Sequence, residues 1–91
     1  MVLTYSITIS GKVQGVFFRQ TARERASALG ISGSVKNNDN GDVEIIATGT
    51  KDQLDDFLSW CRQGPPKAIV DNVNFKEIPL QEFERFSVIR S

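Results

Sequence analysis

The sequence predicts an α+β protein with a ferredoxin-like sandwich fold, in which two helices cover one face of an antiparallel-rich sheet. Three observations predict this fold. Apolar residues alternate with period two in some segments and recur at helical spacing in others, these segments follow the order βαββαβ with a short terminal strand, and glycine or proline separates most of them. A chain of 91 residues has the size of one small domain, so we expect residues 1–91 to form a single domain.

The first strand is predicted over residues 3–10, where apolar and polar side chains alternate strictly. The expected core face carries Leu3, Tyr5, Ile7 and Ile9, and the expected solvent face carries Thr4, Ser6, Thr8 and Ser10. A solvent face made of hydroxyl side chains offers no aromatic platform on which bases could stack. RNA binding, which some ferredoxin-like domains perform, is therefore disfavoured.

Two helices are predicted from apolar residues that recur every three or four positions. The first runs over residues 18–29, and Gly30 is placed to end it. The second begins after Thr50, because Thr50 and Gln53 have the spacing of a capping box. It ends at Gly-Pro-Pro, residues 64–66, since proline cannot continue a helix.

A hairpin is predicted between strands over residues 31–38 and 43–48. Asn-Gly at residues 40–41 is the dipeptide favoured by a two-residue type I′ turn, in which both central residues have positive φ. A fourth strand over residues 68–77 alternates imperfectly, which indicates a bulge, and a short fifth strand is predicted over residues 84–90.

The stretch GKVQGVFFRQ, residues 11–20, links the first strand to the first helix. The two strands of this βαβ unit run parallel, so Asn37 at the end of the second strand is expected beside the stretch. Amide groups of a loop that opens a helix converge where the helix dipole is positive, and such an arrangement binds anions. Gly15 allows the main chain to approach a ligand closely, and Arg19 adds a guanidinium group suited to phosphate oxygens.

By spacing alone, this stretch fits two interpretations. It is either an anion site or a plain strand-to-helix turn with a solvated arginine, because it contains neither a Walker A loop nor a GxGxxG motif. A positive charge in the first helical turn opposes the helix dipole, which favours an anionic partner for Arg19. In the anion-site interpretation Phe18 anchors the helix in the core and Phe17 forms a wall of the loop.

The composition argues against several classes of function. Eleven basic and eleven acidic residues cancel, so no overall charge favours nucleic acid or an anionic membrane. Without histidine and with Cys61 as the single cysteine, the chain has no plausible zinc site, and we expect no metal and no cofactor. The sequence contains no apolar run of about 20 residues and no signal-peptide pattern, so we expect a cytoplasmic protein without membrane contacts.

A set of motifs extends over nearly the whole chain. GKVQGVFFR at residues 11–19 is followed by Leu29-Gly30, by Val35 and Asn37, by GDVE at residues 41–44 and by the Gly-Pro-Pro at the end of the second helix. In this order and at these separations, the motifs resemble the acylphosphatase family. The resemblance implies a metal-free enzyme that hydrolyses the carboxyl-phosphate bond of small acyl phosphates to a carboxylate and inorganic phosphate.

The resemblance also assigns residues to this reaction. It implies that Arg19 binds the phosphate and that Asn37 positions the attacking water. Asn38 competes for the second role, but the motif and the register from Val35 favour Asn37. The substrate-binding residues implied are Gly15, Val16, Phe17, Phe18 and Arg19, and the catalytic residues implied are Arg19 and Asn37.

Two features depart from the family pattern. The hairpin has Asn-Gly where the family usually has Asp-Gly, an exchange that preserves the turn. Many members carry a hydroxyl residue three places after the arginine, where this chain has Ala22, preceded by Thr21. The alternative function is a non-catalytic anion-binding module, since a fold does not determine a function, but the presence of Arg19 and Asn37 favours the enzyme. We expect a monomer whose partners are the acyl phosphate substrate and the phosphate product.

Overall fold

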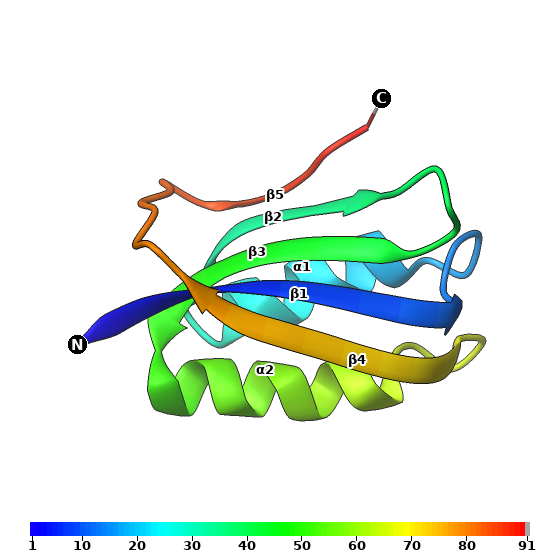
Figure 1. Cartoon of the computed structure of the whole chain (residues 1–91), viewed down its shortest axis with the longest axis horizontal. Helices are drawn as coiled ribbons and strands as arrows, with labels where there is room; N and C mark the ends of the chain where they lie inside the picture. The colour runs from blue at the N-terminus through cyan, green and yellow to red at the C-terminus, as the bar shows by residue number, and fades with distance from the viewer. Residues whose placement is uncertain (91) are drawn as a thin grey trace.

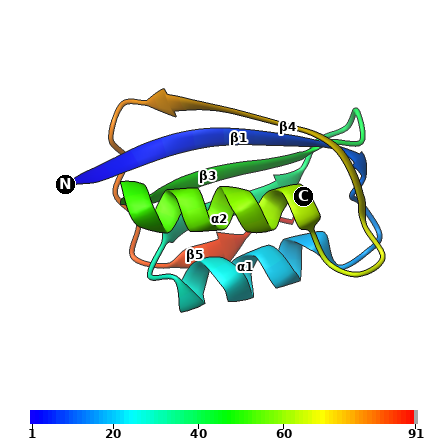
Figure 2. The same cartoon turned by 90° about the horizontal axis from the view of Figure 1, so that it is seen from below.

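The computed structural model describes residues 1–90, and its elements follow the predicted order (Figure 1). They are β1 (Val2–Lys12), α1 (Phe18–Ala28), β2 (Ser32–Asn37), β3 (Val43–Thr50), α2 (Lys51–Gln63), β4 (Ile69–Ile78) and β5 (Phe86–Val88). The five strands form one sheet in the order β4-β1-β3-β2-β5. Both helices lie on the same face of this sheet, as Figure 2 shows, so the predicted ferredoxin-like architecture is confirmed. None of the helices in the described part of the chain is long and apolar enough to cross a membrane.

The central strand β3 determines the directions of its neighbours. It pairs antiparallel with β1 on one side and with β2 on the other. β1 and β2 therefore run in the same direction, as predicted, although β3 separates them. Their C-terminal ends lie at the same end of the sheet, where the β1–α1 loop and the β2–β3 hairpin are neighbours (Figure 1). The edge strand β5 pairs parallel with β2.

The core fills the space between the sheet and the two helices. The apolar stripe of α2 is buried, and Leu54, Phe57 and Cys61 are fully inaccessible to solvent. The predicted capping box is present, because Thr50 accepts from the Gln53 amide and the Gln53 side chain accepts from the Thr50 amide. This cap and the apolar stripe fix both the start and the orientation of α2.

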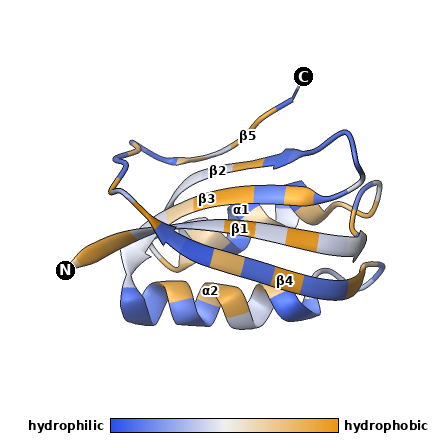
Figure 3. Cartoon of the chain, viewed as in Figure 1, coloured by the Kyte–Doolittle hydropathy of each residue, from blue (hydrophilic) through white to orange (hydrophobic). Residues whose placement is uncertain are grey.

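The β2–β3 turn differs from the predicted two-residue type I′ turn. The Asn38 amide donates to the Asp42 carbonyl at 2.8 Å, and the Gly41 amide donates to the Asn38 carbonyl at 3.1 Å. Gly41 has a φ of 98°, but Asn40 is not in the positive-φ region, which a type I′ turn requires. The turn is therefore a three-residue loop, hydrophilic throughout (Figure 3), that ends in a positive-φ glycine.

The predicted bulge in the fourth strand is confirmed. Ser10 of β1 pairs with Asn72 of β4, but the next residue, Gly11, pairs with Val70. Asp71 is thus an extra residue on β4 without a partner on β1. Figure 3 shows hydrophilic and hydrophobic stretches along β4, and the strand register places the bulge at the end of β4 nearest the β1–α1 loop (Figure 1).

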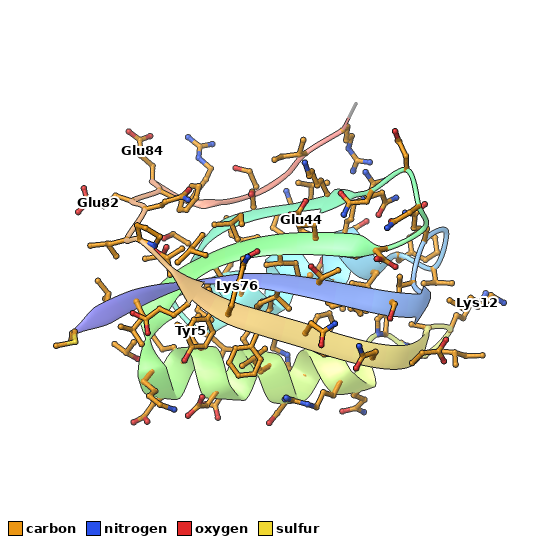
Figure 4. The ribbon with its side chains drawn as sticks, in the orientation of Figure 1. Tyr5, Lys12, Glu44, Lys76, Glu82 and Glu84 are labelled. Carbon is orange, nitrogen blue, oxygen red and sulfur yellow. The ribbon has the colours of Figure 1, made fainter. Side chains whose placement is uncertain are left out.

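The open face of the sheet is partly covered, which the sequence did not predict. Thr4 was expected on the solvent face but is fully buried. The Gln81 amide donates to Thr4 Oγ1 at 2.9 Å, Thr48 Oγ1 donates to the Gln81 carbonyl at 2.8 Å, and the two hydroxyl groups are 2.7 Å apart. The β4–β5 connection therefore crosses the sheet at these threonines, while Glu82 and Glu84 of the connection point into solvent (Figure 4).

We predict that Thr48→Val lowers the free energy of unfolding by about 1 to 3 kcal/mol, because it removes the 2.8 Å hydroxyl donor of the partly buried Gln81 carbonyl and the hydroxyl partner of the buried Thr4 side chain. Thr8→Val is the matched control. Thr8 lies on the same face of β1 as Thr4, and its hydroxyl has no hydrogen-bond partner among the described residues. The free energy of unfolding of Thr8→Val should therefore change by less than about 0.5 kcal/mol. Urea unfolding of both variants measures the difference, and equal losses would contradict a role for the threonine network.

Candidate active site

The sheet end shared by β1 and β2 contains a hollow of about 320 Å³. It is lined by Val13, Gly15, Phe17, Phe18, Arg19, Gln20, Asn37 and Arg90. A second hollow of about 390 Å³ shares Arg19, Asn37 and Arg90 with the first and extends to Lys36 and Ile89. The fold thus brings Arg19 and Asn37, 18 positions apart in the sequence, to one concave surface.

The main chain of the β1–α1 loop leaves its amide groups without acceptors at the start of α1. Gly15 has a φ of 75°, and α1 begins at Phe18 without a side-chain cap and without an acidic residue in its first turn. The amide groups of residues 15–20 donate no hydrogen bond to any acceptor in the described chain. Unsatisfied amides at the positive end of a helix dipole favour an anion at this position.

Phe17 has an unusual backbone conformation. Among the described residues it alone combines a side chain with positive φ, at 65°, while its ψ is 24°. The Thr21 amide and the Thr21 hydroxyl both donate to the Phe17 carbonyl, at 3.1 and 2.8 Å. Thr21 therefore supports the loop directly, while the neighbouring Ala22 is fully buried in the core.

The side chains of Val16 and Phe18 point into the core, whereas that of Phe17 is exposed. Their side chains are buried, with exposed fractions of 5% and 2%. The Phe18 ring packs on Trp60 of α2, with ring centroids 5.3 Å apart. These two side chains anchor the loop in the core, and Val16 does not line the hollow, so its main-chain amide is the group that it can offer to a ligand.

Gln14 connects the loop to the β2–β3 hairpin. Its Nε2 donates to the Asn38 carbonyl at 2.8 Å and to the Asp42 carbonyl at 2.9 Å. A side-chain amide has two donors, and here both are used across the gap between the loop and the hairpin. This contact of Gln14 has no signal in the sequence, because its two acceptors are main-chain groups that only the folded hairpin brings together.

Arg19 contacts the C-terminal segment. Its Nη1 donates to the Ile89 carbonyl at 3.3 Å, and the Ile89 amide donates to the Val35 carbonyl of β2 at 2.8 Å. Within residues 1–90, no carboxylate lies within ion-pair distance of Arg19. Its positive charge is therefore available to a ligand in the hollow.

Two further cations lie at the site and were not predicted to contribute to it. Arg90 lines both hollows and Lys36 lines the second. Lys36 is paired with Glu44, with Nζ and Oε1 3.5 Å apart, and Figure 4 shows Glu44 on the face of the sheet opposite the helices. Lys12, labelled in the same figure, extends into solvent at the end of β1 and is not among the lining residues.

Asn37 is the last residue of β2 and is half-buried. Its Oδ1 is buried and has no hydrogen-bond partner among the described residues, where no other buried side-chain nitrogen or oxygen is left without one. Such an atom is costly unless water or a ligand supplies a donor. Asn38 uses its main chain in the hairpin turn and does not line either hollow, so the geometry favours Asn37 over Asn38.

Cys61 does not belong to this site. Its side chain is buried in the core, and this burial raises the pKa of the Cys61 thiol far above its usual range. A buried neutral thiol is a poor nucleophile. Within the described chain, no three histidine, cysteine, aspartate or glutamate side chains cluster as a metal site would need.

Sequence and structure comparisons relate the chain to known proteins. A family model described as acylphosphatase matches residues 5–88. An acylphosphatase of Coxiella burnetii is 46% identical over 82 residues, which cover 90% of this chain and 86% of that relative. The solved structure of an acylphosphatase from Coxiella burnetii superposes with a TM-score of 0.94 at 43% identity, covering 97% of this chain and 93% of that one.

A second solved structure is similarly close. The crystal structure of acylphosphatase from Bacillus subtilis superposes with a TM-score of 0.94 at 35% identity, and the match covers 99% of this chain and 100% of that one. The family model, the similar sequence and both structures agree, and each extends over most of the chain. The chain belongs to the acylphosphatase family.

Proposed function

We propose that the protein hydrolyses the carboxyl-phosphate bond of small acyl phosphates in the first hollow, with Arg19 and Asn37 as catalytic residues. Membership of the acylphosphatase family makes it an enzyme of this reaction class. The observation that carries the mechanism is the meeting of three features at one surface: the unsatisfied amides of residues 15–20, the Arg19 guanidinium and the unpartnered Asn37 Oδ1.

The phosphoryl group binds at the β1–α1 loop. Its oxygens accept hydrogen bonds from the loop amides and from Arg19, which neutralise the negative charge of the phosphoryl group in the ground state and in the transition state. The main-chain amides that bind the phosphoryl oxygens include those of Gly15, Val16, Phe17 and Phe18. Phosphoryl transfer depends largely on positioning and charge stabilisation, and the loop supplies both.

Asn37 orients the nucleophile. A water molecule that donates a hydrogen bond to Asn37 Oδ1 lies at the edge of the phosphoryl site and attacks phosphorus in line with the carboxyl oxygen. The bond between phosphorus and that oxygen breaks, and its electron pair leaves with the carboxylate. The water proton passes to a phosphoryl oxygen of the substrate, so the products are a carboxylate and inorganic phosphate.

The leaving group explains why so few side chains suffice. A carboxylate is a weak base and departs without protonation by a general acid, so the absence of histidine is no obstacle. Arg19 and the amides supply the charge stabilisation for which other phosphoryl-transfer enzymes use a metal ion. We therefore propose a metal-independent, cofactor-free enzyme that acts as a single-domain monomer in the cytoplasm, a reducing compartment that suits a single cysteine. No observation favours a non-catalytic anion-binding module.

Excess EDTA should leave the hydrolysis of acetyl phosphate or benzoyl phosphate unchanged, because the proposed mechanism uses no divalent ion. Phosphate monoesters should be poor substrates, since their alkoxide leaving groups need an acid that this site lacks. Phosphate release is measured for both substrate classes with and without chelator. Activity that EDTA abolishes and a divalent ion restores would refute metal independence, and equal turnover of monoesters would refute the leaving-group argument.

Arg19→Ala and Asn37→Ala should have different kinetic effects. Arg19 contacts the phosphoryl group before and during the reaction, so its loss should weaken inhibition by inorganic phosphate at least about tenfold and remove most turnover. Asn37 contacts the water, so Asn37→Ala should lower kcat by about 10² to 10³ while the inhibition constant of phosphate stays nearly constant.

Arg23→Ala is the control for Arg19→Ala, because Arg23 is an exposed arginine on α1 and lines neither hollow. Both kinetic parameters should be unchanged in this variant. The division of labour would be wrong if Asn37→Ala kept normal turnover or lost phosphate binding as severely as Arg19→Ala. Circular dichroism spectra of each variant establish that it is folded.

Gly15→Val should weaken both folding and phosphate binding. At a φ of 75° a β-branched residue is strained, and we expect a loss of about 1 to 3 kcal/mol of unfolding free energy. Gly41→Val is a matched control, since Gly41 also has positive φ, and an added Cβ meets no atom within 4 Å at either glycine. The control should lose similar stability but keep the wild-type phosphate inhibition constant. An inhibition constant that stays unchanged in Gly15→Val would argue against the loop as the phosphate site.

A further inference from the structure

Phe17 combines two unfavourable features that neither the core nor the helix explains. Its side chain is 73% exposed, although both flanking side chains are buried. Its backbone occupies the left-handed region, which is uncommon for a residue with a bulky side chain. Such conformations persist where the surrounding structure enforces them, and they cluster at ligand-binding sites.

The surrounding structure holds the Phe17 ring outward. Val16 and Phe18 insert into the core on either side, so the chain cannot rotate Phe17 inward without extracting one of them. The two hydrogen bonds from Thr21 to the Phe17 carbonyl fix the following peptide group. The backbone therefore directs the Phe17 side chain outward, and Phe17 is one of the residues that line the first hollow.

The two hollows indicate which part of a substrate Phe17 contacts. Asn37 and Arg19 line both hollows, but Phe17 and Gln20 line only the first, whereas Lys36 and Ile89 line only the second. In phosphoryl transfer the attacking and leaving oxygens lie roughly in line on opposite sides of phosphorus. With the water on Asn37, the acyl group is directed away from Asn37, toward the part of the first hollow that Phe17 lines.

We infer that Phe17 is a specificity-determining residue that contacts the acyl group and favours aromatic acyl phosphates over small aliphatic ones. This inference rests on the proposed function. A flat apolar acyl group that stacks on the ring removes apolar surface of both partners from water, and aromatic pairs have an additional preference for offset or edge-to-face contact. Such a contact would cover the apolar ring, which is exposed in the free protein.

The test compares kcat/KM for benzoyl phosphate and acetyl phosphate in the wild type and in Phe17→Asn. Asparagine tolerates the left-handed conformation, so this variant removes the ring and keeps the loop backbone. The ratio of the two kcat/KM values, benzoyl over acetyl, should fall by about two- to tenfold, the size expected from one aromatic contact. Taking the ratio relative to the wild type cancels the different intrinsic reactivities of the two substrates.

Two further variants act as controls. Phe17→Tyr keeps the aromatic ring and should keep the ratio. Leu80→Asn removes an exposed apolar side chain outside both hollows and should also keep it. A ratio that is unchanged in folded Phe17→Asn would overturn the inference. A preference for monosuccinyl phosphate over benzoyl phosphate that Phe17→Asn does not alter would also overturn it. Such a preference would indicate that the acyl group contacts the cations Arg90 and Lys36.

Binding of phosphonates separates this inference from the proposed function. Phenylphosphonate and methylphosphonate carry the same anionic group and are not hydrolysed, so their dissociation constants for the wild type report the contact with Phe17 without any turnover. The inference predicts tighter binding of phenylphosphonate, and equal binding would overturn it without any variant. If the wild type hydrolysed neither acyl phosphate but kept this preference, the proposed function would fail and the apolar contact would stand.

Discussion

The antiparallel pairing of β3 with both β1 and β2 is the constraint on which the site depends. It makes β1 and β2, the strands on either side of β3, run in one direction, so the loop after β1 and the last residue of β2 meet at one end of the sheet. Gln14 then fixes the distance between them with two hydrogen bonds to the hairpin. The Ile89 main chain connects Arg19 to β2 from the other side. Arg19 and Asn37, which come from separate elements, thus line one hollow without a hydrogen bond between their side chains among the described residues.

The site is also where the molecule leaves its polar groups unsatisfied. Within the described chain, the amides of residues 15–20 have no acceptor, the Arg19 guanidinium has one, and Asn37 Oδ1 has no donor. The side chains of Val16 and Phe18 in the same stretch are buried. Groups of this kind lower the stability of the free protein. In the proposed mechanism a phosphoryl group and a water molecule satisfy them together, and the donors need not reorganise when charge develops during the reaction.

The sequence predicted features that depend on local pattern. Periodicity gave the strands and helices, the Thr50 and Gln53 spacing gave the cap of α2, and imperfect alternation gave the bulge in β4. The predicted type of the hairpin turn was wrong. Asn-Gly suits a two-residue type I′ turn, but a three-residue loop also uses a positive-φ glycine, and only the strand register distinguishes the two turns.

Features that depend on distant contacts could not be predicted. Thr4 is buried by a segment 77 positions away, and Gln14 and Arg90 belong to the site only because the hairpin and the C-terminal segment fold against the loop. Arg19 and Asn37 were predicted as site residues from a motif and from the βαβ geometry, and both line the same hollow. The left-handed conformation of Phe17 has no signal in the sequence, since phenylalanine rarely adopts it.

The most direct test of the account is a titration of the isotope-labelled protein with inorganic phosphate, followed in proton–nitrogen correlation spectra. The central claim is that the unsatisfied amides of residues 15–20 and the Arg19 guanidinium bind the phosphoryl group. The account predicts saturable shifts concentrated in these amides and in the Arg19 Nε signal, with little change on β4 and the outer face of α2. Saturable shifts elsewhere, with the amides of residues 15–20 unchanged, would contradict it.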